Sequence, residues 1–360
     1  MDKCRQYVCL VVNNLAGAFP LRRIDASSLF YPMNQAVNQV RFALPPDELP
    51  LPPPCISFSP SRSSFGKGIL EFFGLFGHGQ KKTLLAAMDY HGVSLMYDVD
   101  DCIITDIDTP KVPKLCEPIS VALGDALYVM DSKLIPGRRS CFDALILGPS
   151  KDLLCTRSQW NWCSLQPPPF IFEPGYKTTR IGAYTVFGPS SILISMPNIG
   201  TYSFDTVSSS WNKAGDWELP FHGRADFIPE YGVWLGFSAE GNQLCYFSDL
   251  RASMQQQRAL DTVWDDPNMQ LFLNNPTPLR YTRILSSQLV YLGSGKFCVA
   301  KLFERVENEV IEEGYLPRHE SFVVLTGLVA KPGKLARGIE MIPHKSLLYR
   351  FGGIANCWAF

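Results

Sequence analysis

At four places that recur once per roughly 45 to 60 residues of this 360-residue chain, an aromatic residue followed by aspartate, directly or after one residue, closes an apolar run. The four copies are Tyr97-Asp98, Phe142-Asp143, Phe204-Asp205 and Phe247-Ser248-Asp249. Tryptophans follow three of them, at Trp160, Trp162, Trp211, Trp217 and Trp264. An aromatic signature that returns about every 40 to 50 residues is typical of the four-stranded blades of a β-propeller. The sequence therefore predicts an all-β fold, a single β-propeller.

The apolar runs between these copies divide into four short strands per period. The five predicted blades contain residues 55–58, 83–88, 93–99 and 102–107; then 118–123, 126–130, 141–147 and 160–165; then 182–187, 191–196, 201–206 and 211–219; then 225–228, 233–237, 244–249 and 262–265; then 289–292, 296–303, 321–328 and 338–342. The N-terminal hairpin and residues 346–351 have no blade of their own. We expect these N- and C-terminal strands to form a sixth blade together and close the ring, which removes two exposed sheet edges. Five or seven blades remain open alternatives, because the repeat is degenerate.

Two segments interrupt the pattern. Residues 32–54 are proline-rich and predict an irregular connection, since proline cannot donate a hydrogen bond to a sheet. Residues 61–82 form an aromatic-rich insertion whose spacing favours a short helix packed against the body, with a partner-binding or membrane-surface helix as the alternative. The loops after Asp249 and Phe303 are polar and are expected to be helical. We expect all of residues 1–360 to form one domain.

The repeated aromatic and aspartate residues are predicted to be structural. Aromatic rings at corresponding positions bury a large area between neighbouring sheets. Each aspartate is expected to accept hydrogen bonds from turn amides at the end of a strand. Neither set is therefore a candidate for chemistry.

Composition limits the partners and the compartment. The net charge is −1 and only 19% of residues are charged, whereas nucleic-acid binding requires a basic excess. No apolar run approaches the roughly 20 residues that span a bilayer, and the apolar stretch at residues 8–12 is too short for a signal peptide. The eleven cysteines are odd in number and lack Cys-x-x-Cys spacing, which indicates free thiols. We therefore expect a monomer in the cytoplasm or nucleus that binds neither nucleic acid nor membrane.

Several strings of residues resemble an uncharacterised family of grass proteins, known as domain of unknown function 1668 and thought to be propeller-like. The strings are Arg5-Gln6-Tyr7-Val8, Leu21-Arg22-Arg23-Ile24-Asp25, Pro52-Pro53-Pro54-Cys55-Ile56-Ser57-Phe58, Leu127-Tyr128-Val129-Met130-Asp131, Ser140-Cys141-Phe142, Gly200-Thr201-Tyr202-Ser203-Phe204-Asp205-Thr206, Ala214-Gly215-Asp216-Trp217-Glu218-Leu219-Pro220-Phe221-His222-Gly223-Arg224-Ala225, Leu292-Gly293-Ser294-Gly295-Lys296-Phe297-Cys298 and Leu325-Thr326-Gly327. This resemblance covers nearly the whole chain. It implies a plant source and one domain, and it implies no activity. The chain is more distantly similar to kelch propellers, although the paired glycines of kelch repeats are missing after the second strands.

The one candidate binding site joins the third predicted blade to the fourth. His222 and Arg224 flank a glycine there, with Trp217 nearby, and in the blade assignment this junction lies at the mouth of the propeller channel. Such a set could hold a carboxylate, a phosphate or a peptide side chain. In the alternative reading, Arg224 pairs with an acid such as Asp216 and His222 caps a turn.

No pattern indicates catalysis or a cofactor. The five histidines lack metal-ligand spacing, and no Gly-x-Ser-x-Gly elbow, phosphate loop or dinucleotide fingerprint is present. Five aspartates lie between residues 98 and 108, but the glycine and downstream glutamate of a calcium-binding loop are missing. The alternation Thr105-Asp106-Ile107-Asp108 instead predicts a strand with one solvated face.

Function is thus predicted only as a class. A non-catalytic propeller that binds a protein or peptide through loops on one face fits the pattern best. The alternatives are a sugar-active enzyme of the galactose-oxidase type and a glycan or small-molecule binder. A fold alone does not separate these readings, because function belongs to sites carried on the fold.

Overall fold

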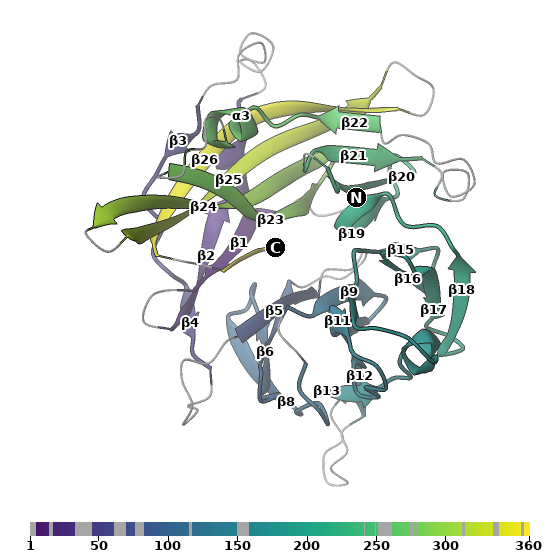
Figure 1. Cartoon of the computed structure of the whole chain (residues 1–360). Coiled ribbons are helices and arrows are strands. Elements are labelled where there is room, and N and C mark those ends of the chain that lie inside the picture. Colours follow the sequence, from purple (N-terminus) through teal and green to yellow (C-terminus); the bar gives the residue numbers. More distant parts are fainter. Residues whose placement is uncertain are drawn as a thin grey trace.

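A computed structural model describes residues 5–13, 17–32, 45–60, 70–75, 83–114, 117–149, 158–240, 242–248, 250, 261–273, 277, 280–311, 314–333, 338–353 and 356–360. The fold is all-β. The described helical segments are the 3-10 turns η1 (Ala26–Leu29) and η2 (Pro169–Phe172) and the short α-helix α3 (Pro267–Leu273). Figure 1 shows the sheets arranged around a common centre.

The middle of the chain forms four groups of antiparallel strands, as the sequence predicts, which we call the first to fourth sheets; the third and fourth are joined into one eight-stranded sheet by a parallel pair of strands, one from each. The first contains β5 (Leu70–Leu75), β6 (Leu84–Asp89), β7 (Ser94–Asp98) and β8 (Ile103–Ile107); the second β9 (Ile119–Leu123), β10 (Ala126–Met130), β12 (Phe142–Pro149) and β13 (Ser158–Ser164); the third β15 (Ala183–Phe187), β16 (Ser191–Met196), β17 (Gly200–Asp205) and β18 (Ser210–Gly215); the fourth β19 (Phe221–Ile228), β20 (Val233–Ser238), β21 (Leu244–Phe247) and β22 (Asp261–Trp264). A two-stranded pair, β11 (Lys133–Leu134) and β14 (Thr179–Arg180), lies beside them. In Figure 1, β5, β9, β15 and β19 lie nearest the centre.

The first of these sheets corrects the prediction for the aromatic-rich insertion. Residues 70–75 form strand β5 instead of a helix, while residues 61–69 and 76–82 lie outside the described part of the chain. The strand expected to begin this sheet, β4 (Ile56–Phe58), pairs instead with β2 (Phe19–Asp25). Buried side chains follow one another along β5, so the helical spacing was misleading: a strand covered on both faces reads as a continuous apolar run.

The two ends of the chain also differ from the prediction. Residues 346–351, expected beside the N-terminal hairpin, belong to the long strand β26 (Ile339–Gly352). A later strand, β27 (Cys357–Ala359), pairs with β1 (Tyr7–Val12), giving the order β27-β1-β2-β4. The N- and C-terminal strands therefore share one sheet, but through residues 357–359.

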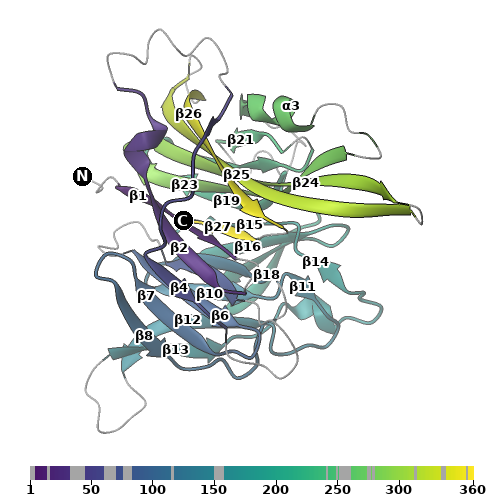
Figure 2. The same ribbon diagram turned by 90° about the vertical axis from the view of Figure 1, so that its left-hand side faces the viewer.

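The fifth predicted group of strands is much longer than the others. It contains β23 (Arg280–Gly293), β24 (Lys296–Ile311), β25 (Gly314–Pro332) and β26, with β3 (Asp47–Glu48) added in parallel beside β26. The expected helical loop after Phe303 is wrong, because β24 continues to Ile311 and pairs with β25 to the end. Figure 2 shows this hairpin extending beyond the other sheets. Strand β3 lies within the proline-rich connection of residues 32–54.

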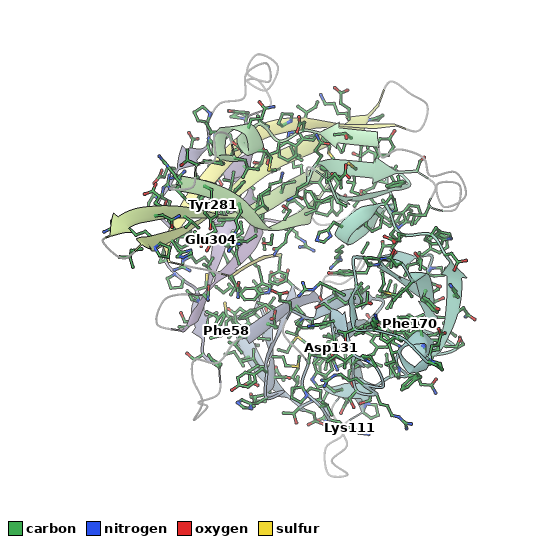
Figure 3. All side chains as sticks on the ribbon, in the orientation of Figure 1. Phe58, Lys111, Asp131, Phe170, Tyr281 and Glu304 are labelled. Atoms are coloured by element: carbon green, nitrogen blue, oxygen red, sulfur yellow. The ribbon has the colours of Figure 1, made fainter. Side chains whose placement is uncertain are left out.

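Aromatic side chains fill the spaces between neighbouring sheets, as predicted. The aromatic members of all four repeats are buried, namely Tyr97, Phe142, Phe204 and Phe247. In Figure 3, Phe58 and Phe170 lie among the packed side chains, whereas Lys111 lies at the outer margin. Since burying such rings removes a large apolar area from water, this repeat contributes strongly to the core.

Candidate functional site

The connection from β18 to β19 carries the three predicted site residues, and the structure places them differently. Trp217 is half-buried and packs with Leu219 and Phe221 in an apolar cluster. Its backbone carbonyl accepts a hydrogen bond from the Thr201 hydroxyl at 2.7 Å. His222 is exposed and lies within strand β19, paired in register with Phe237, so it does not cap a turn. Trp217 is thus part of the core of this junction, while His222 faces solvent.

Arg224 lies beside an acid and a phenol. Its guanidinium forms an ion pair with Asp226 at 2.7 Å, and its side chain is 40% exposed. In the parallel pairing of β15 with β19, Arg224 lies opposite Tyr184. Desolvation by the surrounding strands acts to lower the pKa of Arg224, but the Asp226 carboxylate and Tyr184 hold that pKa above its ordinary value. The expected acid, Asp216, instead pairs with Lys213 at 2.5 Å.

This arrangement makes the inner strand β19 a polar surface next to the centre of the molecule. Arg5, from the segment before β1, is close enough to Arg224 and Asp226 for their charges to affect its pKa, which desolvation lowers. One guanidinium group, one carboxylate and one phenol therefore lie together, and the charge of Arg5 acts on this group from a distant part of the chain. Such a group can bind an anionic or hydrogen-bonding side chain of a partner, with Arg224 already oriented by Asp226.

A second titratable group lies on another inner strand. Glu71 of β5 accepts a hydrogen bond from the backbone N–H of Glu117 at 3.1 Å. Burial raises the pKa of Glu71 to about 7, while the hydrogen bonds from the Glu117 N–H and the Trp358 side chain act to lower it. The Glu117 carboxylate, which forms an ion pair with Arg180 at 2.5 Å, adds to the rise. Glu71 can therefore change charge near neutral pH at the junction of three sheets.

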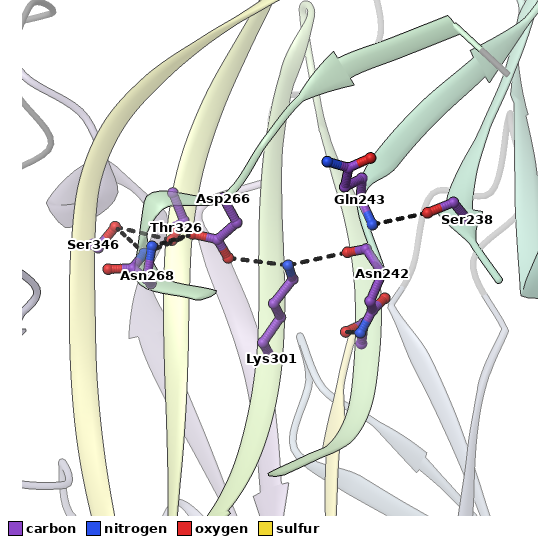
Figure 4. A network of polar contacts seen from close by, with 9 residues as sticks. Ser238, Asn242, Gln243, Asp266, Asn268, Lys301, Thr326 and Ser346 are labelled. Atoms are coloured by element: carbon purple, nitrogen blue, oxygen red, sulfur yellow. Dashed lines mark hydrogen bonds and ion pairs between the residues drawn. The ribbon is translucent and has the colours of Figure 1, made fainter. Parts of the chain in front are cut away.

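A buried network joins the fourth sheet to the fifth, and Figure 4 shows it. Lys301 of β24 pairs with Asp266 at 3.1 Å and donates to the carbonyl of Asn242 at 3.2 Å. Asp266 also accepts hydrogen bonds from the backbone and side chain of Asn268. Both charged side chains are almost completely buried, and burial lowers the pKa of Lys301. We interpret this network as structural, because every charge in it is matched and enclosed.

A second buried pair lies beneath the second sheet. Lys114 pairs with Asp143 and also donates to the Ser140 carbonyl at 3.3 Å. Nearby, the buried Asp131 carboxylate accepts from Arg138 at 2.8 Å. Here the repeated aspartate has a buried cation as its partner, in place of the turn amides that the sequence predicts.

Tyr184, Asp226, Arg5 and Glu71 were missing from the predicted site. For Asp226 a signal was present: residues two apart on a strand point to the same face, so Arg224 and Asp226 are placed to pair. The other three come from distant segments of the chain, and no spacing in the sequence relates them. Within the described residues, no group of three or more histidine, cysteine, aspartate or glutamate side chains could hold a metal ion.

The described strands define an all-β protein whose sheets are arranged around a centre. The sequence matches the family described as protein of unknown function (DUF1668) over residues 5–349. The chain therefore belongs to this family. No helix among the described segments is long and apolar enough to cross a membrane.

Comparisons with other proteins give only distant likenesses. None of the curated proteins matches. The β-propeller domain of Cps50 (Swd1) from Myceliophteria_thermophila aligns with a TM-score of 0.30 and 12% identity, over 46% of this chain and 50% of that one. The extracellular domain of BT3049 from B. thetaiotaomicron aligns with a TM-score of 0.24 and 9% identity, over 74% of this chain and 36% of that one. The chain thus spans half or less of each of these structures, and neither likeness bears on its function.

Proposed function

We propose that this protein is a non-catalytic β-propeller scaffold that binds a protein or peptide partner through one face, with His222 and Arg224 in the contact and Trp217 as its apolar support. The observation that carries the proposal is the ion pair of Arg224 and Asp226, whose side chains are 40% and 30% exposed, on the inner strand β19 beside Tyr184. Because both side chains are partly accessible to solvent on a strand near the centre of the molecule, a ligand can reach the pair.

The proposed architecture has six blades. Four come from β5 to β22, one from the long strands β23 to β26, and the last from β27, β1, β2 and β4. The pairing of β27 with β1 supports ring closure by both ends of the chain. A closed ring is rigid, and this rigidity would hold loops from different blades in a constant relative position.

Purification of the tagged protein from its source tissue, with mass spectrometry of what is recovered, tests the binding site. The test variant is His222→Ala/Arg224→Ala. We expect wild type to recover a reproducible partner and the double variant to lose it. The matched control is Arg280→Ala. Arg280 is an exposed arginine on β23 that pairs with Glu307 of β24, away from the β18–β19 connection.

Two outcomes contradict the proposal. One is recovery of the same partner in equal amount by wild type and the double variant. The other is a double variant that is less stable in thermal unfolding yet binds unchanged, because His222 and Arg224 would then serve the fold alone. Metal analysis of the same sample separates the scaffold from a copper enzyme: stoichiometric copper would favour sugar oxidation.

We propose one domain, a monomer, and a cytoplasmic or nuclear location. Buried thiols such as Cys298 and Cys357 support a reducing compartment, since they pack as small apolar side chains and burial raises their pKa values. The plant source and the distant kelch relationship depend on the sequence strings alone.

A further inference from the structure

Strand β8 forms an outer edge of its sheet, at the periphery of the molecule. It is the last strand in the order β5-β6-β7-β8 and has no further strand partner among the described residues. Ile103 and Ile104 on this strand are 54% and 48% exposed. Two adjacent half-exposed isoleucines on a sheet edge are a ready template for pairing with another chain.

The corresponding edge of the third sheet has a different character. Strand β18 presents exposed Asn212 and Lys213, and its Trp211 indole donates to the Gln166 carbonyl at 2.8 Å. Polar and lysine-bearing edges of this kind are how proteins prevent strand addition. The apolar character of β8 is therefore not a general property of the outer strands of this fold.

The register of β8 indicates how a partner would bind. Ile103 lies opposite Asp98, and Ile104 lies opposite Tyr97. Because adjacent residues of a strand point to opposite faces, a globular surface docked on one face would cover only one isoleucine. A strand added along the edge would give both isoleucines a cross-strand neighbour.

Charge decides which strand can be added. Residues 98–108 contain five aspartates and no lysine or arginine, and Asp100 and Asp106 are exposed. A second copy of this chain would bring the same acids against each other, which is unfavourable for directly opposed strands. Among the described residues, Arg23 approaches at the Cys102 end, where it donates to the thiol at 3.4 Å. The complementary occupant is a basic segment.

We propose that β8 is a docking edge for an extended lysine- or arginine-bearing segment of another protein, which adds to the sheet as a further strand. Its basic residues would lie beside the exposed Asp100 and Asp106. Its apolar residues would cover Ile103 and Ile104. This edge is separate from the β18–β19 connection, so the substitution His222→Ala/Arg224→Ala is expected to leave it unchanged.

Fluorescence anisotropy with the full chain tests this edge. The probe is a labelled peptide of alternating valine and lysine, and the comparison peptide has glutamate in place of each lysine. We expect binding of the lysine peptide only. The variants Ile103→Thr/Ile104→Thr and Asp106→Lys should each weaken it about tenfold or more. Threonine retains a β-branched side chain, so strand formation is preserved.

The matched controls lie on edge strand β18 of the third sheet and in the turn that precedes it. Val207→Thr changes an apolar side chain that is 83% exposed, and Lys213→Glu changes the charge on β18. Both should bind the lysine peptide like wild type. The proposal is overturned if neither peptide binds, if both bind equally, or if the controls weaken binding as much as the β8 variants. A concentration-dependent dimer that Ile103→Thr/Ile104→Thr abolishes would also overturn it, since the occupant would be a second copy.

Discussion

The repeats Phe142-Asp143 and Phe204-Asp205 have the same two residues. Their phenylalanines pack in the same way, whereas their aspartates have different partners. Their phenyl rings meet edge to face, with centroids 4.9 Å apart and planes at 84°. Both rings are buried in the same apolar cluster between the second and third sheets. The aromatic residue of the repeat is therefore a core residue in both sheets.

The aspartates of these two repeats behave differently. Asp205 ends strand β17 and accepts hydrogen bonds from the N–H groups of Val207 and Ser208, as the sequence predicts. Asp143 lies near the start of β12, and its buried carboxylate pairs with Lys114. The difference follows from position: an aspartate that ends a strand is next to a turn, whereas one that begins a strand is carried into the sheet. A repeat can thus preserve packing while the chemistry of its acid changes.

Of the substitutions that test this difference between the two aspartates, removal of the buried cation Lys114 should change stability most. Lys114→Met leaves the Asp143 carboxylate buried without its ion-pair partner. We expect a loss of about 3–5 kcal/mol in the free energy of unfolding, because the cost of an uncompensated buried charge is high. Urea unfolding measures this change.

Two further variants make this test decisive. Lys213→Met breaks the exposed ion pair with Asp216 and should have little measurable effect. The double variant Lys114→Met/Asp143→Leu removes both buried charges and should recover much of the lost stability. If Lys114→Met is no more harmful than Lys213→Met, then the buried and exposed acids of the fold are equivalent and the comparison fails.

Glu71 is a buried acid whose charged neighbour is another carboxylate, that of Glu117, instead of a cation. We expect its substitution to change stability less than Lys114→Met does. Its pKa is raised from an ordinary value of 4.5 to about 7. Between these two pH values the folded protein binds more protons than the unfolded chain, so stability falls as pH rises. Glu71→Gln removes this penalty and should raise stability by about 2 kcal/mol at pH values above about 7.

Thermal unfolding at acidic and alkaline pH measures this effect. The melting temperatures of Glu71→Gln and wild type should converge toward acid and separate as pH rises. Glu218→Gln is the matched control, because Glu218 is exposed and also accepts one backbone amide, that of Asn198, at 2.9 Å. Equal pH dependence of the two variants would show that the burial of Glu71 has no energetic consequence.

The sequence predicted the strands that are bounded by turn residues, and it failed where burial or long-range pairing removes the usual strand pattern. The second and third sheets were predicted closely because turn residues separate their short strands; Gly124, with φ of +60°, marks the turn between β9 and β10. Strand β5 was missed because Leu70, Phe72 and Phe73 are all buried and the alternation of a half-exposed strand is lost. The polar ends of β24 and β25 were missed because their pairing with each other holds them in the sheet.

Only those residues of the candidate site that lie close together in the sequence were predictable. Arg224 and His222 were identified from one short string, and Asp226 follows two residues later. Tyr184 lies 40 residues earlier in the chain, and only the parallel register of β15 and β19 brings it beside Arg224. Pairing between sheets depends on tertiary packing, which no local pattern in a single sequence encodes.

The smallest expected effect is at Asp205, the acid of the comparison that accepts hydrogen bonds from turn amides. Hydrogen bonds from the backbone and hydroxyl of Ser208 hold the pKa of Asp205 below its ordinary value of 3.8. Its contribution to stability is therefore present above pH 3.8 and is lost as pH falls through the lower folded-state pKa. Asp205→Ala should lower the melting temperature slightly at neutral pH, and the difference from wild type should vanish in acid.

Asp216→Ala, which removes an exposed acid that pairs with a side chain instead of turn amides, should show a smaller loss at neutral pH. A loss for Asp205→Ala that persists unchanged in acid would mean that its charge is irrelevant to the turn, and the two repeated aspartates would then differ in burial alone.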